Sequence, residues 1–420
     1  MDSVRIGSYM KDLMTAYDGL RGQCPRAAGA GFWDVVVISA GDEEQRAWYE
    51  AQLSLKHEAR ELPLVTFLVI PDPPGPRIGS GGSTLHILRS LKQRYGDEMN
   101  QLRILLIHAG GYSKRLPSHS CSGKIFSPLP IAASDGGLYQ MLDLKLAMYL
   151  PFLAMMEPGV FITASDDIEV FNMDSENLDM TLMAGEAVTA LAHPSSLFIG
   201  TTHGVYVMSP ERNKSLQDVR PCLEVLQKPS VELMRERGAV RNEEEADGAE
   251  SVYSDSAFWL HAPTSNKLVK MYEEIGSLDS ESCIYGDFLT CLGQREDKYH
   301  VVQLYKELNN NKDASDIRRK FNDKVGSTKL TVLSLHQSKF YHLGTTAEYM
   351  HGLTADSSLR EELNLSPVVA SSIRRPGEAQ VEGIVLMSDI EQAVIVPHDA
   401  IIEFSIIKSK VRIPIIKSIL

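Results

Sequence analysis

The stretch ILLIHAGGYSKRLPSHSCSGK at residues 104–124 brings together residue types that suit a nucleoside triphosphate. An apolar run stops at Gly110 and Gly111, a cationic loop follows, and Lys124 comes nine positions after Arg115. Glycines lack a Cβ atom, so backbone N–H groups can come close to phosphate oxygens. Arginine and lysine neutralise the negative charge that builds up during phosphoryl transfer. We therefore expect this loop to bind the phosphates of a nucleotide.

The loop is not a Walker A motif. That motif, aligned on Lys124, needs a glycine where Ser118 stands and a hydroxyl where Ile125 stands. The predicted nucleotide site instead uses the glycine pair and the two residues after it, Tyr112 and Ser113.

A second glycine-rich stretch, IGSGGSTL, has the composition of a helix start. Gly79, Gly81, Gly82 and Ser83 precede leucines that are spaced three residues apart, as on one face of a helix. The free amides at such an N-terminus bind anions, so we expect these four residues to contact the nucleotide. The alternative is a flexible turn in which Ser83 caps the helix.

A pair of carboxylates follows the apolar run at 160–165. Neighbouring strand residues point to opposite faces, so only one of Asp166 and Asp167 can easily face a ligand. The alternative is that the pair simply opens a turn.

The order of these runs predicts the fold class. Apolar strand-like segments alternate with helical ones, which indicates α/β architecture with a doubly wound, mostly parallel sheet covered by helices on both faces. Ligands of such sheets bind at the carboxyl ends of the strands, where all of the stretches above fall. The strand-like segments are 35–40, 67–70, 104–107 and 160–165.

Six blocks in one order resemble the signature of the sugar-phosphate nucleotidyltransferases. With IGSGGSTL, their wording is most similar to the fucose-1-phosphate guanylyltransferase (GDP-L-fucose pyrophosphorylase) family, over roughly residues 30–355. The blocks are AGGYSKRLP with GKIFSPLP, FITASDD (161–167), HGVYV (203–207), LQKPS (226–230), YGDFL (285–289) and FYHLGTTAEY (340–349).

The resemblance implies a Rossmann-like nucleotidyltransferase fold and roles for particular residues. Arg115 and Lys124 would neutralise the triphosphate, and Asp166 would bind Mg²⁺ or Mn²⁺, with Asp167 supporting it or binding ribose. Asp287 would be the second metal ligand, although a Gly-Asp pair before an apolar helix is also a common cap.

The sugar side is likewise implied by the resemblance. Lys228 would hold the sugar phosphate, although Gln227 stands where the family usually has glutamate. His203, Gly204 and Asp255 would contact the sugar, although His203 is equally compatible with a structural role.

Composition narrows the class of partners. The net charge of −13 argues against nonspecific binding to nucleic acid or to anionic membranes, and no apolar segment is long enough for a membrane span or signal peptide. Five cysteines without a CxxC pair indicate reduced thiols and a cytoplasmic protein. Oligomeric state is left open.

Three regions are expected: an N-terminal helical segment (1–30), a catalytic domain (31–355) and a C-terminal extension (356–420). The extension has short apolar clusters every five to eight residues, as in a few rungs of a parallel β-helix. Every predicted site residue precedes Tyr349, so we expect the extension to be peripheral to the site.

The function expected from the resemblance is transfer of a guanylyl group from GTP to L-fucose 1-phosphate, giving GDP-L-fucose and pyrophosphate. Two alternatives stay open. One is a non-catalytic regulatory subunit that binds nucleotide sugars, and the other is the same chemistry with another sugar 1-phosphate or nucleoside triphosphate.

Overall fold

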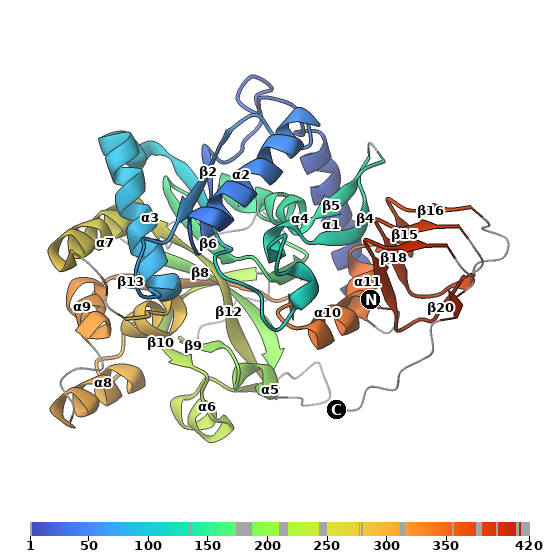
Figure 1. Cartoon of the computed structure of the whole chain (residues 1–420). Helices are drawn as coiled ribbons and strands as arrows, with labels where there is room; N and C mark the ends of the chain where they lie inside the picture. Colours follow the sequence, from blue (N-terminus) through green and yellow to red (C-terminus); the bar gives the residue numbers. More distant parts are fainter. Residues whose placement is uncertain are drawn as a thin grey trace.

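The computed structural model describes residues 2–134, 136–173, 187–209, 217–242, 250–276, 278, 280–310, 316–354, 357–374, 380–391, 394–408 and 411–412. Its centre is a large twisted sheet with helices on both faces (Figure 1). In spatial order, the sheet consists of β2 (Thr66–Pro71), β1 (Val35–Ala40), β3 (Arg103–His108), β6 (Gly159–Ala164), β12 (Glu250–His261), β8 (Ala187–Ser196), β13 (Lys329–Leu335), β10 (Gln217–Gln227) and β9 (Gly204–Met208), and β11 (Arg241–Asn242) pairs with β12.

The sheet is less parallel than the sequence predicts. Strands β2, β1, β3 and β6 form a parallel block, and β8 pairs in parallel with β13. The long strand β12 runs antiparallel to both β6 and β8, and β10 runs antiparallel to β13 and β9. The sheet is therefore mixed, and its parallel block is the part formed by the predicted β-α alternation.

Residues of the parallel block alternate between two cores. Val36 and Ile38 of β1 belong to one core, while Val35 and Val37 belong to the other. Because both faces are covered, all six residues of β1 are buried, which explains why the strand is a continuous apolar run rather than an alternating one.

Two sets of helices cover the two faces (Figure 1). Helices α1 (Asp2–Asp18), α2 (Glu43–Glu58) and α4 (Met141–Met148) contribute to the first core. Helices α3 (Gly79–Tyr95), α7 (Ala262–Ile275) and α9 (Asp316–Val325) contribute to the second. The remaining helical elements include α5 (Leu197–Gly200), α6 (Val231–Arg237), α8 (Tyr299–Asn310), α10 (Thr346–Leu353), α11 (Ser358–Glu362), and the short turns η1 (Gly96–Gln101), η2 (Pro117–His119), η3 (Lys124–Phe126), η4 (Leu150–Ala154), η7 (Ile284–Phe288) and η8 (Leu289–Cys291).

Two small sheets lie beside the central one. Strand β4 (Pro128–Ala132) pairs with β5 (Leu138–Gln140), and β7 (Asp167–Phe171) pairs with β14 (Ser338–His342). The second pairing brings the chain after Asp166 against the chain that ends at His342. Residues more than 160 positions apart in the sequence therefore meet just after the carboxyl end of β6.

The C-terminal region forms three short parallel sheets, and within each sheet successive turns of the chain pair side by side. Val368 pairs with Val385, which pairs with Ile402, two steps of 17 residues. The strands are β15 (Val368–Val369), β18 (Ile384–Leu386) and β21 (Ile401–Glu403); β16 (Ser372–Ile373), β19 (Asp389–Ile390) and β22 (Ile406–Ile407); and β17 (Gln380–Val381), β20 (Val394–Val396) and β23 (Val411–Arg412).

The turns of chain that carry these nine short strands, from β15 to β23, are called the coils below. The coils are joined to the rest of the protein through a shared core. Val369, Ile384 and Leu386 belong to the same apolar cluster as α1, α2 and α4, and the Ser366 amide donates to the Pro130 carbonyl at 2.7 Å. Helix α11 packs on α1, so the expected boundary at 355 falls between elements that pack together. The coils therefore begin near Val368 and share a core with the rest of the protein.

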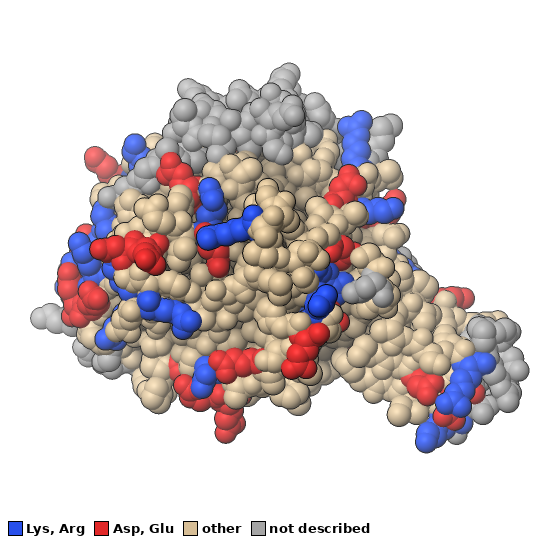
Figure 2. Space-filling view, turned by 90° about the horizontal axis from the view of Figure 1, so that it is seen from above, with Lys and Arg blue, Asp and Glu red and all other residues tan. Residues whose placement is uncertain are grey.

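Charge is mixed on the face that Figure 2 shows, where acidic and basic side chains are interspersed. Within the described residues, no helix has both the length and the apolar character needed to span a bilayer.

Candidate functional site

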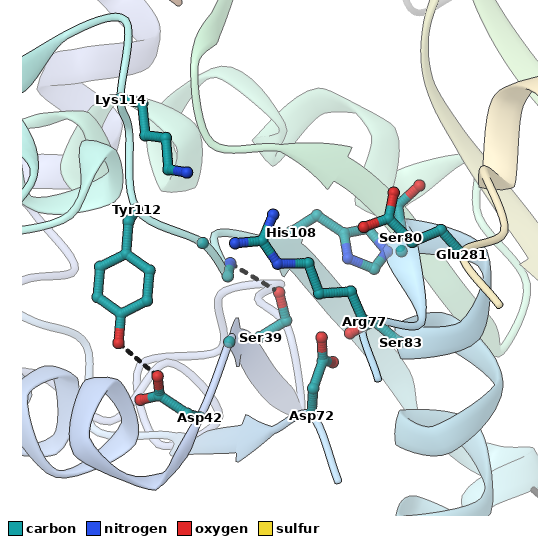
Figure 3. A pocket seen from close by; sticks show the side chains of 14 residues that line it. Ser39, Asp42, Asp72, Arg77, Ser80, Ser83, His108, Tyr112, Lys114 and Glu281 are labelled. Atoms are coloured by element: carbon teal, nitrogen blue, oxygen red, sulfur yellow. Dashed lines mark hydrogen bonds between the residues drawn. The ribbon is translucent and has the colours of Figure 1, made fainter. Parts of the chain in front are cut away.

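A cavity of about 440 Å³ opens at the carboxyl ends of the parallel block (Figure 3). Each of three neighbouring strands ends in this cavity, because parallel strands place their carboxyl ends at one edge. Its lining comes from β1 and the turn after it (Ser39, Gly41, Asp42), from the segment after β2 (Asp72, Arg77), from the start of α3 (Gly79, Ser80, Ser83), from β3 and its loop (His108, Gly110, Gly111, Tyr112, Lys114), and from Glu281.

A second cavity, of about 260 Å³, shares a wall with the first. His108, Gly110, Gly111 and Tyr112 line both, and the second adds Ser113, Lys124, Ser165 and Asp166. The two cavities together are suited to a ligand with two parts: the first is the larger, and the second carries a facing cation and carboxylate.

Lys124 and Asp166 meet in this second cavity. The Lys124 Nζ atom lies 2.6 Å from Asp166 Oδ2, and His342 Nε2 lies 3.3 Å from the same oxygen. Burial opposes ionisation of Asp166, but contact with His342 and Lys124 outweighs it and holds the pKa of the carboxyl well below its usual range. On its other side, His342 contacts Glu348 through Nδ1 at 3.2 Å.

The structure distinguishes the two neighbouring aspartates. Asp166 lines the second cavity, whereas Asp167 is buried and bonded to the buried Lys145. Lys145 is also held by the Thr163 hydroxyl at 3.1 Å. Asp167 is thus part of an internal ion pair, and Asp166 is the carboxylate that can meet a ligand.

The glycine pair of the signature loop is packed differently from the prediction. The Gly110 amide donates to the Ser39 hydroxyl at 3.1 Å, and the Gly111 amide donates to Gln45 Oε1 at 3.1 Å. A Cβ atom on Gly110 would come within 3.0 Å of the Ala40 carbonyl carbon, so glycine is needed here for close approach to β1. These amides are occupied, and the positive charge facing the cavities comes from Lys114, Lys124 and Arg77 instead.

The glycines of α3 divide into two groups. Gly79 lines the first cavity, as does Ser83. Gly81 donates its amide to the Ser282 carbonyl at 2.7 Å, and a Cβ atom on Gly82 would meet Leu278 and Ile78. Gly81 and Gly82 are therefore required by packing and do not line the cavity, which corrects the expectation that they contact the nucleotide.

Arg115 does not face either cavity. Its side chain is exposed, and its carbonyl accepts a hydrogen bond from the Thr346 amide at 2.9 Å. Its neighbour Lys114 lines the first cavity instead. Of these two neighbouring cations, Lys114 is therefore the one that lines a cavity.

The sugar-side residues lie together, but Gly204 serves another purpose than predicted. Its amide donates to Asp255 Oδ1 at 2.9 Å, and a Cβ atom there would meet the same carboxylate. Burial raises the pKa of Asp255 to about 7, while the Gly204 amide and the Lys228 charge oppose that shift. His203 Nδ1 lies 3.1 Å from the Ile199 carbonyl, and its ring packs edge-on against Phe340.

Lys228 has an unusual backbone. Its φ of 46° lies in the left-handed region that disfavours residues with a Cβ atom, and the next residue is Pro229. The Lys228 amide donates to the His203 carbonyl at 2.9 Å, which holds the exposed lysine beside the sugar-side residues. Such strain commonly occurs at functional sites.

Both carboxylate oxygens of Asp287 are engaged by neighbouring groups of the protein. Its Oδ1 atom pairs with Arg318 at 2.8 Å, and its Oδ2 atom accepts the Cys283 amide at 2.7 Å. These contacts fit the alternative interpretation of Asp287 as a cap.

A divalent cation fits Asp166 but not Asp287. In the described part of the chain, no hydrogen bond engages Asp166 Oδ1, so an ionised oxygen is left for a hard cation. No group of three or more His, Cys, Asp or Glu side chains is arranged to hold a metal among the described residues. Asp166 would therefore need phosphate oxygens of the substrates to complete the coordination.

Sequence reasoning missed several residues of the site. Ser39, Asp42, Asp72 and His108 all lie at or just after the carboxyl ends of predicted strands, which was the available signal. Arg77 and Glu281 come from connecting segments and had no such signal. His342 ends β14 and Glu348 lies in α10, so both fall inside the block at 340–349, although no role was predicted for either.

Comparison with known proteins gives consistent matches. Residues 96–420 match the model of the fucose pyrophosphorylase domain. The chain is 39% identical to mouse fucose-1-phosphate guanylyltransferase, over 98% of this chain and 72% of that protein. It is 41% identical to the human protein of the same name, over 84% of this chain and 60% of that protein. A solved UDP-glucose pyrophosphorylase from Acinetobacter baumannii is 9% identical over 84% of this chain and 82% of that one, with a TM-score of 0.33.

Proposed function

The chain belongs to the fucose pyrophosphorylase family, and from that premise we propose that it joins L-fucose 1-phosphate to GTP, giving GDP-L-fucose and pyrophosphate. Membership confirms the resemblance predicted from the sequence. The chain spans 60% of the length of the human relative, so assigning the relative's full activity to this chain is part of the proposal.

The observation that supports the proposal best is the junction of the two cavities. The larger cavity has room for a nucleoside, and the smaller cavity places Lys124 opposite Asp166. The two cavities meet at a shared wall formed by His108, Gly110, Gly111 and Tyr112. A nucleoside in the first cavity would therefore direct its phosphates towards this cation.

The reaction needs no protein nucleophile. A phosphate oxygen of the sugar phosphate forms the new bond to the α-phosphorus of GTP, while the bond from that phosphorus to the pyrophosphate oxygen breaks. Both phosphates are ionised at neutral pH, so catalysis consists of orientation and charge neutralisation. Lys124 and Lys114 would offset charge on the triphosphate, and Lys228 would hold the sugar phosphate. Mg²⁺ or Mn²⁺, held by Asp166, would supply further positive charge at the transferred phosphate.

The test is a panel of nucleoside triphosphates and sugar 1-phosphates, scored by pyrophosphate release. We expect GTP with L-fucose 1-phosphate to be turned over fastest. Tight nucleotide-sugar binding without turnover of any pair would favour the regulatory subunit, and a faster pair of another kind would favour a different specificity.

The first cavity also bears on the choice of base. Figure 3 shows Asp72 and Arg77 pointing towards the same space. Guanine presents acceptors at O6 and N7, which arginine binds in a bidentate manner, and donors that a carboxylate accepts. Within the described residues, Asp72 Oδ1 is buried without a hydrogen-bond partner, which is energetically costly. After a small rotation of the carboxylate, a donor on the ligand would supply the missing hydrogen bond.

Asp72→Asn is therefore expected to raise the KM for GTP about tenfold, the scale of losing one base contact, with less effect on UTP. Burial raises the pKa of Asp72 to about 6, and the hydrogen bond with the Ser83 side chain opposes that rise. The carboxylate is protonated as pH falls through that value and loses its acceptor role, so the KM for GTP should rise below about pH 6 in the wild type only. Steady-state kinetics from pH 5 to 8 measure both effects. Asp97→Asn, at an exposed partner of Lys92, is the control.

Two further features belong to the proposal. The three short parallel sheets of the C-terminal region support an interpretation as the first rungs of a β-helix. The helices on both faces of the parallel block support a doubly wound arrangement. The five free cysteines support a reducing, cytoplasmic location.

A further inference from the structure

We propose that Glu403, from the C-terminal coils, is a positioning residue that holds the Lys124 turn in place through His119. The inference rests on the proposed function, because it assigns the coils a part in the same reaction. It also replaces the expectation that the C-terminal region is peripheral to the site.

His119 is attached to the chain on both sides of Lys124. Its carbonyl accepts the amide of Gly123 at 3.0 Å, and its Nδ1 atom contacts the hydroxyl of Ser127. The Ser127 amide in turn donates to the Lys124 carbonyl at 3.1 Å, which closes the short turn η3. His119 therefore holds the two ends of the segment that carries the lysine.

Glu403 approaches the other edge of the same imidazole. Its Oε2 atom lies 3.4 Å from His119 Nε2 and accepts the Tyr349 hydroxyl at 3.0 Å. The Tyr349 ring packs edge-on against His119 with centroids 4.7 Å apart. One carboxylate oxygen thus joins the coils to both His119 and Tyr349. These contacts fit the His119 tautomer in which Nε2 carries the proton and donates to Glu403, while Nδ1 accepts from the Ser127 hydroxyl.

The network is buried and lies beside the second cavity, because Lys124 and Asp166 line both that cavity and a small one at the network. His119 is 1% exposed and Tyr349 is 3% exposed. A small cavity is lined by both of them and also by Lys124 and Asp166. Burial raises the pKa of Glu403, but His119, Tyr349 and Ser118 outweigh it and lower that pKa, so the acceptor is ionised at neutral pH.

The position of Glu403 explains why coils outside the α/β part matter for the reaction. It is the last residue of β21, whose strand stack shares the main core. If the acceptor is removed, the His119 ring loses its partner on one edge, and the turn bearing Lys124 can shift. A displacement of about 1 Å at a catalytic group is enough to cost up to two orders of magnitude in rate.

The experiment compares Glu403→Ala, Glu403→Gln and Glu391→Ala in the full chain. Glu391 lies on the same coils but contacts Arg374, at 3.5 Å, so it controls for general damage to the coils. Glu403→Ala should lower kcat about tenfold, corrected for the folded fraction by circular dichroism, with a smaller change in KM. Glu403→Gln keeps an acceptor and should restore most of the activity, and Glu391→Ala should resemble the wild type.

Two readouts separate positioning from mere stability. If Glu403 acts through Lys124, Glu403→Ala should have little further effect on kcat in a Lys124→Ala background, because coupled residues are not additive. Trypsin should also cleave after Lys114, Arg115 or Lys124 faster in Glu403→Ala, as identified by mass spectrometry. This second readout does not need activity, so it tests the inference even if the proposed reaction fails. The inference would be overturned if trypsin cleaved Glu403→Ala at the wild-type rate and the losses of kcat were additive in the double variant.

Discussion

Replacing Lys124 with alanine is expected to lower turnover by about two orders of magnitude or more, the scale of removing one charge partner of the transition state. Lys124 is the cation of the second cavity, 2.6 Å from Asp166, and it lies where triphosphate and sugar phosphate would meet. Pyrophosphate release at saturating substrates measures the effect. The fold should survive, because His342 remains beside Asp166 and the turn is held by His119.

Two comparisons make this result specific. Lys124→Arg keeps a charge and should retain part of the activity. Lys92→Ala, which removes the partner of the exposed Asp97, should be close to the wild type. If Lys124→Ala keeps turnover within a few-fold of the wild type, the loop at 104–124 does not carry the charge that neutralises the triphosphate.

The sequence predicted the part of the fold that rests on local pattern. The runs at 35–40, 104–107 and 160–165 are buried strands of the parallel block, since continuous apolar runs flanked by helices have few other folded arrangements. Strand β12 was missed. It contains Ser251, Ser254 and Asp255, and its place between β6 and β8 depends on pairing with distant strands.

The sequence could place residues at strand ends, but it could not place contacts that depend on how distant segments pack. Asp166 was placed correctly at the end of β6, and the two-residue period of a strand explains why Asp167 turns inward to Lys145. The use of the Gly110 amide by Ser39 could not be predicted, because a glycine-rich loop has the same sequence whether its amides meet a phosphate or a neighbouring strand. The same holds for Arg115, whose exposure depends on how the loop meets α10.

The second large effect concerns the divalent cation. Chelation with EDTA is expected to abolish pyrophosphate release, and Mg²⁺ or Mn²⁺ should restore it, because the proposed protein ligand and the substrate phosphates are all hard oxygen donors. Asp166→Asn should lower activity at standard Mg²⁺ by about two orders of magnitude, in part because the amide cannot offset the charge of Lys124. A magnesium titration of each variant measures the requirement directly, and full activity in chelator would exclude a metal role for Asp166.

Asp287→Asn is the informative companion, since the sequence and the structure assign Asp287 different roles. If Asp287 acts through Arg318 and the Cys283 amide, the variant should lose stability, by about 1–3 kcal/mol for a partly buried charged hydrogen bond, and keep the magnesium requirement of the wild type. If Asp287 is instead a metal ligand in the substrate complex, the magnesium concentration for half-maximal activity should rise as it does in Asp166→Asn. Thermal denaturation together with the titration separates the two, because a cap changes the first measurement and a ligand the second. The contacts of both Asp287 oxygens favour the first outcome.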